Sequence, residues 1–449
     1  MFGSRARIVL WIAAAAVVGA VVAGWALPRL VAALPGRVRQ YVPEAVVERV
    51  TTPLPTALPA PTGTPAIALA LAEPASGLPS ADEGTPISRR ADDRPQTTQT
   101  PQAPLATGAV GRGPSSVVPP LPPYARVAGL PIIPQKFNNC GPTNLTLVLN
   151  HFGIEVDQFD VAAVVRPNYE DRNVSPDELV EYVNASSPEW PAPLRAAAYV
   201  GGDVDTLRRL LHAGLPVIIE KGLMPDEATG WMGHYLTLYG YDDITGHFLA
   251  RDTYLGPWRG DGLAGYRDTE RYWEQFNNAF IVVYPPGREA EVAELLGPAF
   301  ADPAAMWGAA AERARAAARL DAANPFVWFN LGASLTELAN LGDPALYEAA
   351  AAAFDQARLL GLPARMMWYR FGPYEAYLAV GRHADVAALA EATLASQGGR
   401  NVEETYLYQG LALAATGDAA GARAALARAT RLNPDSPTGR AALAALEGD

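Results

Sequence analysis

The chain has almost no cysteine or lysine. Its single cysteine, Cys140, allows no disulfide within the chain and excludes a zinc site built from several cysteines. Lys136 and Lys221 are the two lysines, and neither lies in a GxxxxGK[ST] pattern, so no Walker-type nucleotide-binding loop is present. Clustered His or Cys ligands are also missing, so no metal or other cofactor is expected. The net charge of −12 argues against nucleic acid as a partner, because general binding needs a basic surface.

Length and composition predict several modules. The 449 residues are about three times a usual domain of ~150 residues, and 49% of them are hydrophobic, which is ample for globular cores. Sixteen of the 40 prolines fall between Thr52 and Pro123, where large apolar residues are few. Such a stretch cannot bury a core, so we expect an extended, disordered linker there.

An apolar run, residues 8–27, precedes this linker. Its 20 uncharged residues would span ~30 Å as a helix, the thickness of a bilayer core, and Arg5 and Arg7 come before it. We expect an uncleaved transmembrane helix with the rest of the chain outside the cytoplasm, although Arg29, Arg37 and Arg39 on the far side leave the orientation open. A cleaved signal segment or a buried soluble helix are the alternatives, and the former usually has a shorter apolar core.

Residues 124–286 combine helical and strand patterns. Helices are predicted for 140–153 and 203–212, and a capping box, Ser175 to Glu178, opens another. Strands are predicted for 216–220, 234–241, 247–253 and 279–284, with a turn at 243–246 between the second and third. The order predicts an α+β domain in which helices come first and an antiparallel sheet follows.

From about Ala301 the chain becomes helical and rich in alanine, with a repeating pattern. The third unit is the clearest, and it shares small residues at fixed positions, as in Gly410, Ala422 and Ala429 around Leu426. These spacings resemble the tetratricopeptide repeat, in which small residues let two antiparallel helices touch. Trp328, Trp368 and Tyr406 recur at matching positions, where packing between helices is the expected role. An alanine-rich bundle outside any repeat family is the alternative.

Cys140 lies at the predicted start of a helix, followed by Gly141 and Pro142. The helix dipole and the unpaired N–H groups there favour the thiolate form of a cysteine. Gln135, five residues upstream, has a side-chain amide that could meet the Cys140 backbone N–H and form an oxyanion hole, or it could simply cap the loop. The sequence thus predicts a nucleophile with its oxyanion donors.

A thiolate nucleophile needs a general base. His234 follows Gly233 at the start of a predicted strand, and Asp252 lies at the end of the next strand across the hairpin. An antiparallel pair places these two residues side by side, so Asp252 is expected to orient His234. Asp242 and Asp243 lie nearby and are the alternatives, as hairpin-turn residues. None of the other four histidines is expected to be catalytic.

Together, Gln135, Cys140-Gly141-Pro142, Gly233-His234-Tyr235 and Arg251-Asp252 resemble the bacterial double-glycine (bacteriocin-processing) peptidases, which are papain-like cysteine peptidases. The resemblance implies that Cys140 is the nucleophile, His234 the base, Asp252 the orienting acid and Gln135 the oxyanion donor. Members linked to transporters carry membrane and ATPase domains after the peptidase, whereas repeats follow here. Cleavage after Gly-Gly is therefore not implied.

The predicted architecture is an α+β papain-like peptidase domain joined to an all-α tetratricopeptide-like repeat domain. Its parts are a membrane anchor or signal segment (1–28), a juxtamembrane segment and Pro/Thr-rich linker (29–123), the peptidase domain (124–286) and the repeats (287–449). We expect hydrolysis of a peptide or protein substrate, and repeats that recruit substrate or a protein partner without taking part in the chemistry. Transglutaminase-like acyl transfer and an inactive peptide-binding scaffold are the alternatives.

Overall fold

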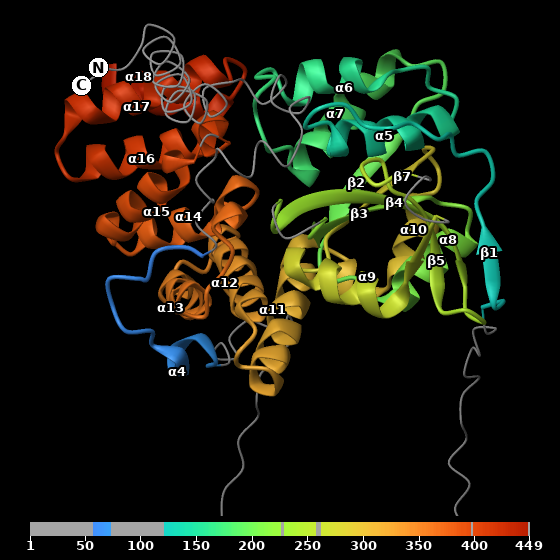
Figure 1. The fold of residues 1–449 in the computed structure, drawn as a ribbon, viewed down its shortest axis with the longest axis horizontal. Coiled ribbons are helices and arrows are strands. Elements are labelled where there is room, and N and C mark those ends of the chain that lie inside the picture. Colours follow the sequence, from blue (N-terminus) through green and yellow to red (C-terminus); the bar gives the residue numbers. More distant parts are fainter. Residues whose placement is uncertain (1–56, 73–120, 226–228, 257–261, 397, 448–449) are drawn as a thin grey trace, which may run out of the picture. The chain divides into compact units, whose positions relative to one another are not determined.

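A region of mixed helix and sheet is followed along the chain by a region of helices (Figure 1). The computed structural model describes residues 57–72, 121–225, 229–256, 262–396 and 398–447. The sheet region runs from β1 (Tyr124–Arg126) to α10 (Glu289–Leu296), and the helical region runs from α11 (Pro303–Leu320) to α18 (Pro437–Glu447). Both regions belong to one compact unit.

Seven antiparallel strands form a single sheet within the described residues. The strand order is β2-β7-β3-β4-β5-β6, and β1 pairs with the end of β4. The longest strand, β4, pairs with β3 along its first half and with β5 along its second half. The strand bounds beyond β1 are β2 (Arg195–Tyr199), β3 (Val217–Leu223), β4 (Met232–Asp242), β5 (His247–Arg251), β6 (Leu263–Gly265) and β7 (Phe280–Tyr284).

The two faces of the sheet carry separate apolar cores, as the two-residue period of a strand dictates. On β3, Ile218 packs with α5 (Cys140–His151), α6 (Gln158–Val165) and α7 (Pro176–Ser186). Its neighbours Val217 and Ile219 pack instead with α8 (Val204–His212) and α10 on the opposite face. Figure 1 shows α5 to α7 on one side of the sheet and α8, α9 (Tyr266–Trp273) and α10 on the other.

Most of the expected elements are present in this region. Ser175 caps α7 through the capping box, and α5 and α8 begin within a residue of their predicted starts. The strand β2 was not predicted, because its sequence Arg-Ala-Ala-Ala-Tyr lacks β-branched residues. Its strand conformation comes from pairing with β7 along all five residues. The helices α6 and α9 were also not predicted.

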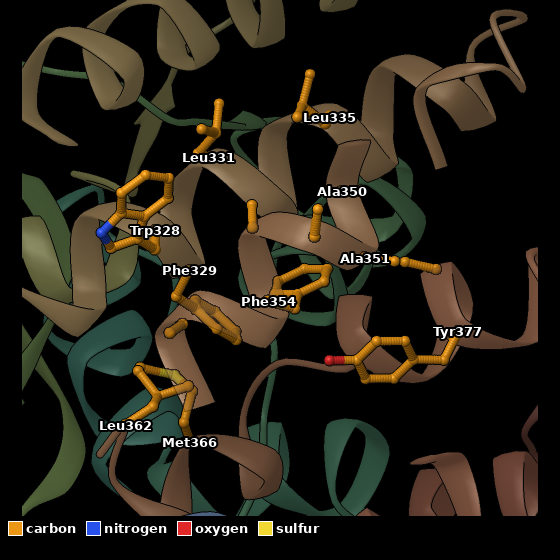
Figure 2. Close-up of a cluster of buried hydrophobic side chains, with 14 of the residues drawn as sticks. Trp328, Phe329, Leu331, Leu335, Ala350, Ala351, Phe354, Leu362, Met366 and Tyr377 are labelled. Carbon is orange, nitrogen blue, oxygen red and sulfur yellow. The ribbon is translucent and has the colours of Figure 1, made fainter. Parts of the chain in front are cut away.

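The helical region is a series of helices that pack on their neighbours in the chain. Gly332 on α12 explains one close approach, because a Cβ at this position would lie 2.7 Å from the ring of Phe354 on α13. Figure 2 shows Phe354 beside Phe329 in the apolar core of this region. The helix bounds are α12 (Pro325–Asn340), α13 (Leu346–Leu359), α14 (Gly372–Ala379), α15 (His383–Ala395), α16 (Glu403–Ala415) and α17 (Ala419–Leu432).

The second expected repeat unit departs most from the pattern. Trp368 ends the 3₁₀ turn η4 (Ala364–Trp368), and the following helix α14 has only eight residues. The third unit follows the expected packing more closely, since a Cβ on Gly410 would lie 2.6 Å from Leu426. Small residues therefore bring paired helices together in this region, as the sequence predicted.

Part of the expected linker is ordered. Residues 57–72 pack on the helical region, with Leu58 and Ala70 buried in its core. The Arg358 side chain donates hydrogen bonds to the carbonyl oxygens of Pro59 and Ala60, and Thr62 donates to the buried carboxylate of Asp385. These residues are ordered although few of them are apolar, because polar groups of the helical region form hydrogen bonds with their backbone. The expectation of disorder throughout 52–123 is therefore wrong for 57–72.

The predicted membrane span, residues 8–27, lies outside the described residues. Within the described ranges, no helix is both long and apolar enough to cross a membrane.

Candidate active site

Cys140 is the first residue of α5, as predicted, and it is half-buried. The next nine residues, Gly141 to Leu149, are buried, so α5 is an internal helix whose start is fixed by its surroundings. Gly141 has little room, because a Cβ there would lie 3.3 Å from the Tyr235 ring and 3.4 Å from Val174. The Cys140 sulfur is consequently held at the N-terminal end of a rigid helix, where the helix dipole favours a thiolate.

A buried polar network fastens α5 to β4 just behind Cys140. The Asn144 amide donates hydrogen bonds to the carbonyl oxygens of Cys140 (2.8 Å) and Tyr235 (2.9 Å). Its own oxygen accepts a hydrogen bond from the Thr237 hydroxyl at 2.6 Å. Asn144 and Thr237 are fully buried, and an unpaired amide there would cost free energy, so these bonds fix the relative position of helix and strand. Sequence analysis missed Asn144, which stands out as a polar residue one turn after Cys140.

Gln135 is held by the same network. Its Oε1 atom accepts a hydrogen bond of 2.9 Å from the Thr253 hydroxyl, and its backbone N–H donates to the Thr253 carbonyl oxygen at 2.9 Å. The Thr253 hydroxyl also accepts from Asn144. Because Oε1 already accepts this hydrogen bond, the side-chain NH2 group of Gln135 is left to donate to another acceptor. Thr253 directly follows Asp252 and therefore links Gln135 to the part of the site that contains this acid.

His234 is buried in β4, with 1% of its surface exposed. Its Nε2 atom donates a hydrogen bond of 3.1 Å to Oδ1 of Asp252. In the described part of the chain, no nitrogen or oxygen atom hydrogen-bonds to the other ring nitrogen, Nδ1. That nitrogen is left for Cys140, which lines the same small pocket as His234. The imidazole therefore stands between the thiol and the carboxylate.

The electrostatics of this arrangement favour an ion pair. Burial works against protonation of His234, but the charge and hydrogen bond of Asp252, with a contribution from Cys140, raise the pKa of His234 to about 9. Burial also opposes ionisation of Asp252, yet the charge of His234 and hydrogen bonds from His234, Leu255 and Tyr254 lower the pKa of Asp252 to about 2. At neutral pH the site thus holds an imidazolium beside a carboxylate.

The alternative acids lie elsewhere. Asp242 accepts hydrogen bonds from the backbone of Ile244 and Thr245 in the β4–β5 turn. Asp243 pairs with Arg208 and accepts a hydrogen bond from the Tyr266 hydroxyl. Both carboxylates therefore form their interactions at the end of β4 opposite to His234.

The pocket around Cys140 and His234 has a wall from the helical region. Tyr369, directly after η4, lines it together with residues of the sheet region. A Cβ on Gly233 would lie 3.1 Å from the Tyr369 ring and 2.8 Å from Phe276, which explains why glycine precedes His234. No sequence motif pointed to Tyr369. The other residues lining this pocket are Asn138, Gly141, Arg172, Val174, Glu220 and Tyr235.

The hairpin ahead of His234 is also anchored by the helical region. The structure pairs Gly222 with Gly233 and Leu223 with Met232, where β3 ends and β4 begins. Trp231 is 9% exposed, and its ring stacks on Phe276 with centroids 5.8 Å apart. The base of this hairpin is consequently part of the fold core.

A larger cavity of about 440 Å³ adjoins the acid side of the site. Asp252 and Thr253 line it, together with Lys221 and Tyr272. Within the described ranges, no group of three or more His, Cys, Asp or Glu side chains is arranged to hold a metal ion.

Comparison with known proteins supports a peptidase domain in this part of the chain. Residues 122–281 match the model of the Peptidase_C39 like family. A solved structure of a candidate C39-like peptidase from Bacillus anthracis is 18% identical, covering 36% of this chain and 96% of that chain with a TM-score of 0.28. A search of curated proteins gave no match.

Proposed function

We propose that the chain is a cysteine peptidase in which Cys140 attacks a peptide carbonyl. The observation that supports this most is the position of His234, with Nε2 bonded to Asp252 and Nδ1 left toward Cys140. A base oriented by a carboxylate and placed beside a thiol at a helix start is the arrangement that nucleophilic catalysis requires. The family match to residues 122–281 agrees with this chemistry.

In the first half of the proposed reaction, the Cys140 thiolate forms a bond to the carbonyl carbon. The oxyanion that develops accepts hydrogen bonds from the Cys140 backbone N–H and the Gln135 amide. His234 then gives its Nδ1 proton to the leaving nitrogen, and the C–N bond breaks. The first product is an amine, and the acyl group stays on Cys140 as a thioester.

In the second half, water attacks the thioester carbon. The neutral His234 takes a proton from this water, and the C–S bond breaks to release a carboxylic acid and the thiolate. Asp252 remains ionised throughout, because its pKa is about 2. Its role is to hold Nε2 so that Nδ1 faces the thiol.

Alkylation by iodoacetamide tests this site without knowledge of the substrate. Cys140 should react readily near pH 6, because the neighbouring His234 imidazolium and the helix start favour the thiolate. The variant His234→Ala should react at pH 6 at least about tenfold more slowly, as an ordinary thiol would. Equal rates in both proteins would indicate an inert scaffold. Product formation that depends on an added amine, in place of hydrolysis, would indicate acyl transfer.

We also propose that the helical region recruits the substrate or a protein partner through tetratricopeptide-like helical hairpins. The close packing of Gly332 on Phe354 and of Gly410 on Leu426 supports this comparison. Pull-down with the full chain carrying Cys140→Ala, which should retain substrate, would identify the partner. Loss of that capture on substitution of exposed residues of α16 to α18 would locate the binding surface, and unchanged capture would exclude it.

A membrane location through residues 8–27, with the remainder outside the cytoplasm, is proposed from the sequence alone. Protease added to intact spheroplasts should then cut within residues 73–120, and residues 57–72 should stay docked on the helical region. Cleavage only after lysis would place the enzyme in the cytoplasm.

A further inference from the structure

Residues 364–370 of the helical region, here called the docking segment, contact the β3–β4 hairpin at three points. Arg365 donates hydrogen bonds to the carbonyl oxygens of Thr229 (2.6 Å) and Trp231 (3.1 Å). The Tyr369 ring covers Gly233. Arg370 forms an ion pair with Glu220. Two of the contacts are with residues shortly before His234, and the third is with Glu220 on β3, which pairs with Tyr235.

The Arg370–Glu220 ion pair lies at the edge of the reactive pocket. The Glu220 side chain is 3% exposed and the Arg370 side chain 23% exposed, so little water screens the pair. Glu220 pairs across the sheet with Tyr235, and the Tyr235 ring contacts Gly141 next to Cys140. Glu220, Cys140 and His234 line the same pocket. A net charge at this place would act on the thiol and the imidazole through a medium of low dielectric constant.

We propose that Arg370 and Tyr369 are positioning residues for the Cys140–His234 pair, so that the active site is completed by the helical region. This inference rests on the proposed function of the site. The sequence predicted instead that all residues of the active site precede residue 287. Burial raises the pKa of Glu220 to about 7, although the charge of Arg370 favours the ionised acid. Arg370 therefore keeps a positive charge beside the pocket below that pH, and Tyr369 fixes the backbone immediately before His234.

Other charged or titratable groups lie around the Cys140–His234 pair or interact with Asp252 and Arg370, and they remain unchanged in the test below. They are Asp252 after β5, Lys221 on β3, Tyr235 on β4, Arg166 after α6, Arg172 before α7 and Asp177 in α7.

The test is the rate of Cys140 alkylation by iodoacetamide at pH 6 in the full chain. At this pH burial keeps Glu220 largely protonated, because its pKa is raised to about 7. Arg370→Met removes the positive charge beside the pocket, which favours the thiolate, so Cys140 should react about tenfold more slowly. Glu220→Gln keeps Arg370 and the shape of the acid, and its rate should stay within about twofold of wild type.

Arg208→Met is the matched control, because it removes an arginine from an ion pair at the far end of β4. Its alkylation rate should equal that of wild type. A rate in Arg370→Met within twofold of wild type would overturn the inference. If Arg370→Met does not fold, Tyr369→Leu should lower the alkylation rate at pH 6 by about tenfold, and a rate within twofold of wild type would overturn it.

Failure of this inference can be distinguished from failure of the proposed function. A Cys140 that behaves as an ordinary thiol in the wild-type protein contradicts the proposed function. A reactive Cys140 whose alkylation rate is insensitive to Arg370 and Tyr369 contradicts the positioning role alone.

Discussion

His234 and Asp252 are 18 positions apart in the chain and are joined by a hydrogen bond of 3.1 Å between Nε2 and Oδ1. The β4–β5 hairpin brings them together, since Thr237 pairs with Arg251 and Asp252 follows directly. Asp252 also accepts hydrogen bonds from the backbone N–H groups of Tyr254 and Leu255, which hold its carboxylate in place. The hairpin thus presents an oriented acid to a buried imidazole.

Asp252→Asn should lower kcat/KM by roughly 10- to 1000-fold while leaving the fold intact. Because Asp252 is a main cause of the raised pKa of His234, the upper limb of the pH–rate profile should also move to lower pH. The control is Asp243→Asn, which changes an acid of the β4–β5 turn. A larger loss of activity in the control would show that the orienting acid is misassigned.

Two glycines of the helical region should respond in opposite ways to alanine. Gly332→Ala brings a Cβ to 2.7 Å from the Phe354 ring and should destabilise the protein by about 1–3 kcal/mol. Gly308→Ala, in the middle of α11, meets nothing within 4 Å and should stabilise by about 0.5–1 kcal/mol. Denaturant unfolding of both variants measures the difference. Equal stabilities would contradict the close helix contact at Gly332.

Arg358 should determine whether residues 57–72 stay docked. Arg358→Met removes the donors to the carbonyl oxygens of Pro59 and Ala60 and one partner of the buried Asp385. We expect a loss of about 3–5 kcal/mol and new proteolytic cleavage near residue 60. Arg440→Met, on the exposed final helix, is the control and should leave the cleavage pattern unchanged. Continued protection of residue 60 in Arg358→Met would contradict the docking.

Four carboxylates between the two regions should make stability depend on pH. Burial raises the pKa of Asp171, Glu178, Glu403 and Glu404, for Glu178 to about 7. Each binds its proton more tightly in the folded state, so its contribution to stability is complete below the unfolded pKa and is lost as the pH rises, for Glu178 between about 4.5 and about 7. The raised pKa of His234 acts in the same direction, from 6.5 to about 9.

We therefore expect Tm to fall by several degrees between pH 5 and pH 8. Glu404→Gln should flatten this decline, because it removes one buried titrating group. Glu291→Gln, on the surface, should not change the slope. A Tm that is constant or rises over this interval would show that these carboxylates are not buried together.

Local signals in the sequence account for most of the site. The position of Cys140 at a predicted helix start indicated that it is the nucleophile. The predicted antiparallel hairpin indicated that His234 and Asp252 lie side by side. What could not be predicted depends on contacts between distant segments. Arg370 and Glu220 are 150 positions apart, and nothing in their local sequence indicates that one neutralises the other.

The same limit applies to the elements that were missed. The alanines of β2 favour a helix locally, and the pairing with β7 overrides that preference. Residues 57–72 have the composition of a linker, and they are ordered because Arg358 and Asp385 supply partners for their backbone and for Thr62.

The measurement that tests the central claim most directly compares protein termini by mass spectrometry in cells that contain the active enzyme or its Cys140→Ala variant. The account predicts a set of new N-termini that appear with wild type and are absent with Cys140→Ala, at equal amounts of folded protein. Identical termini in the two strains, across conditions in which both proteins are present, would contradict a peptidase that works through Cys140.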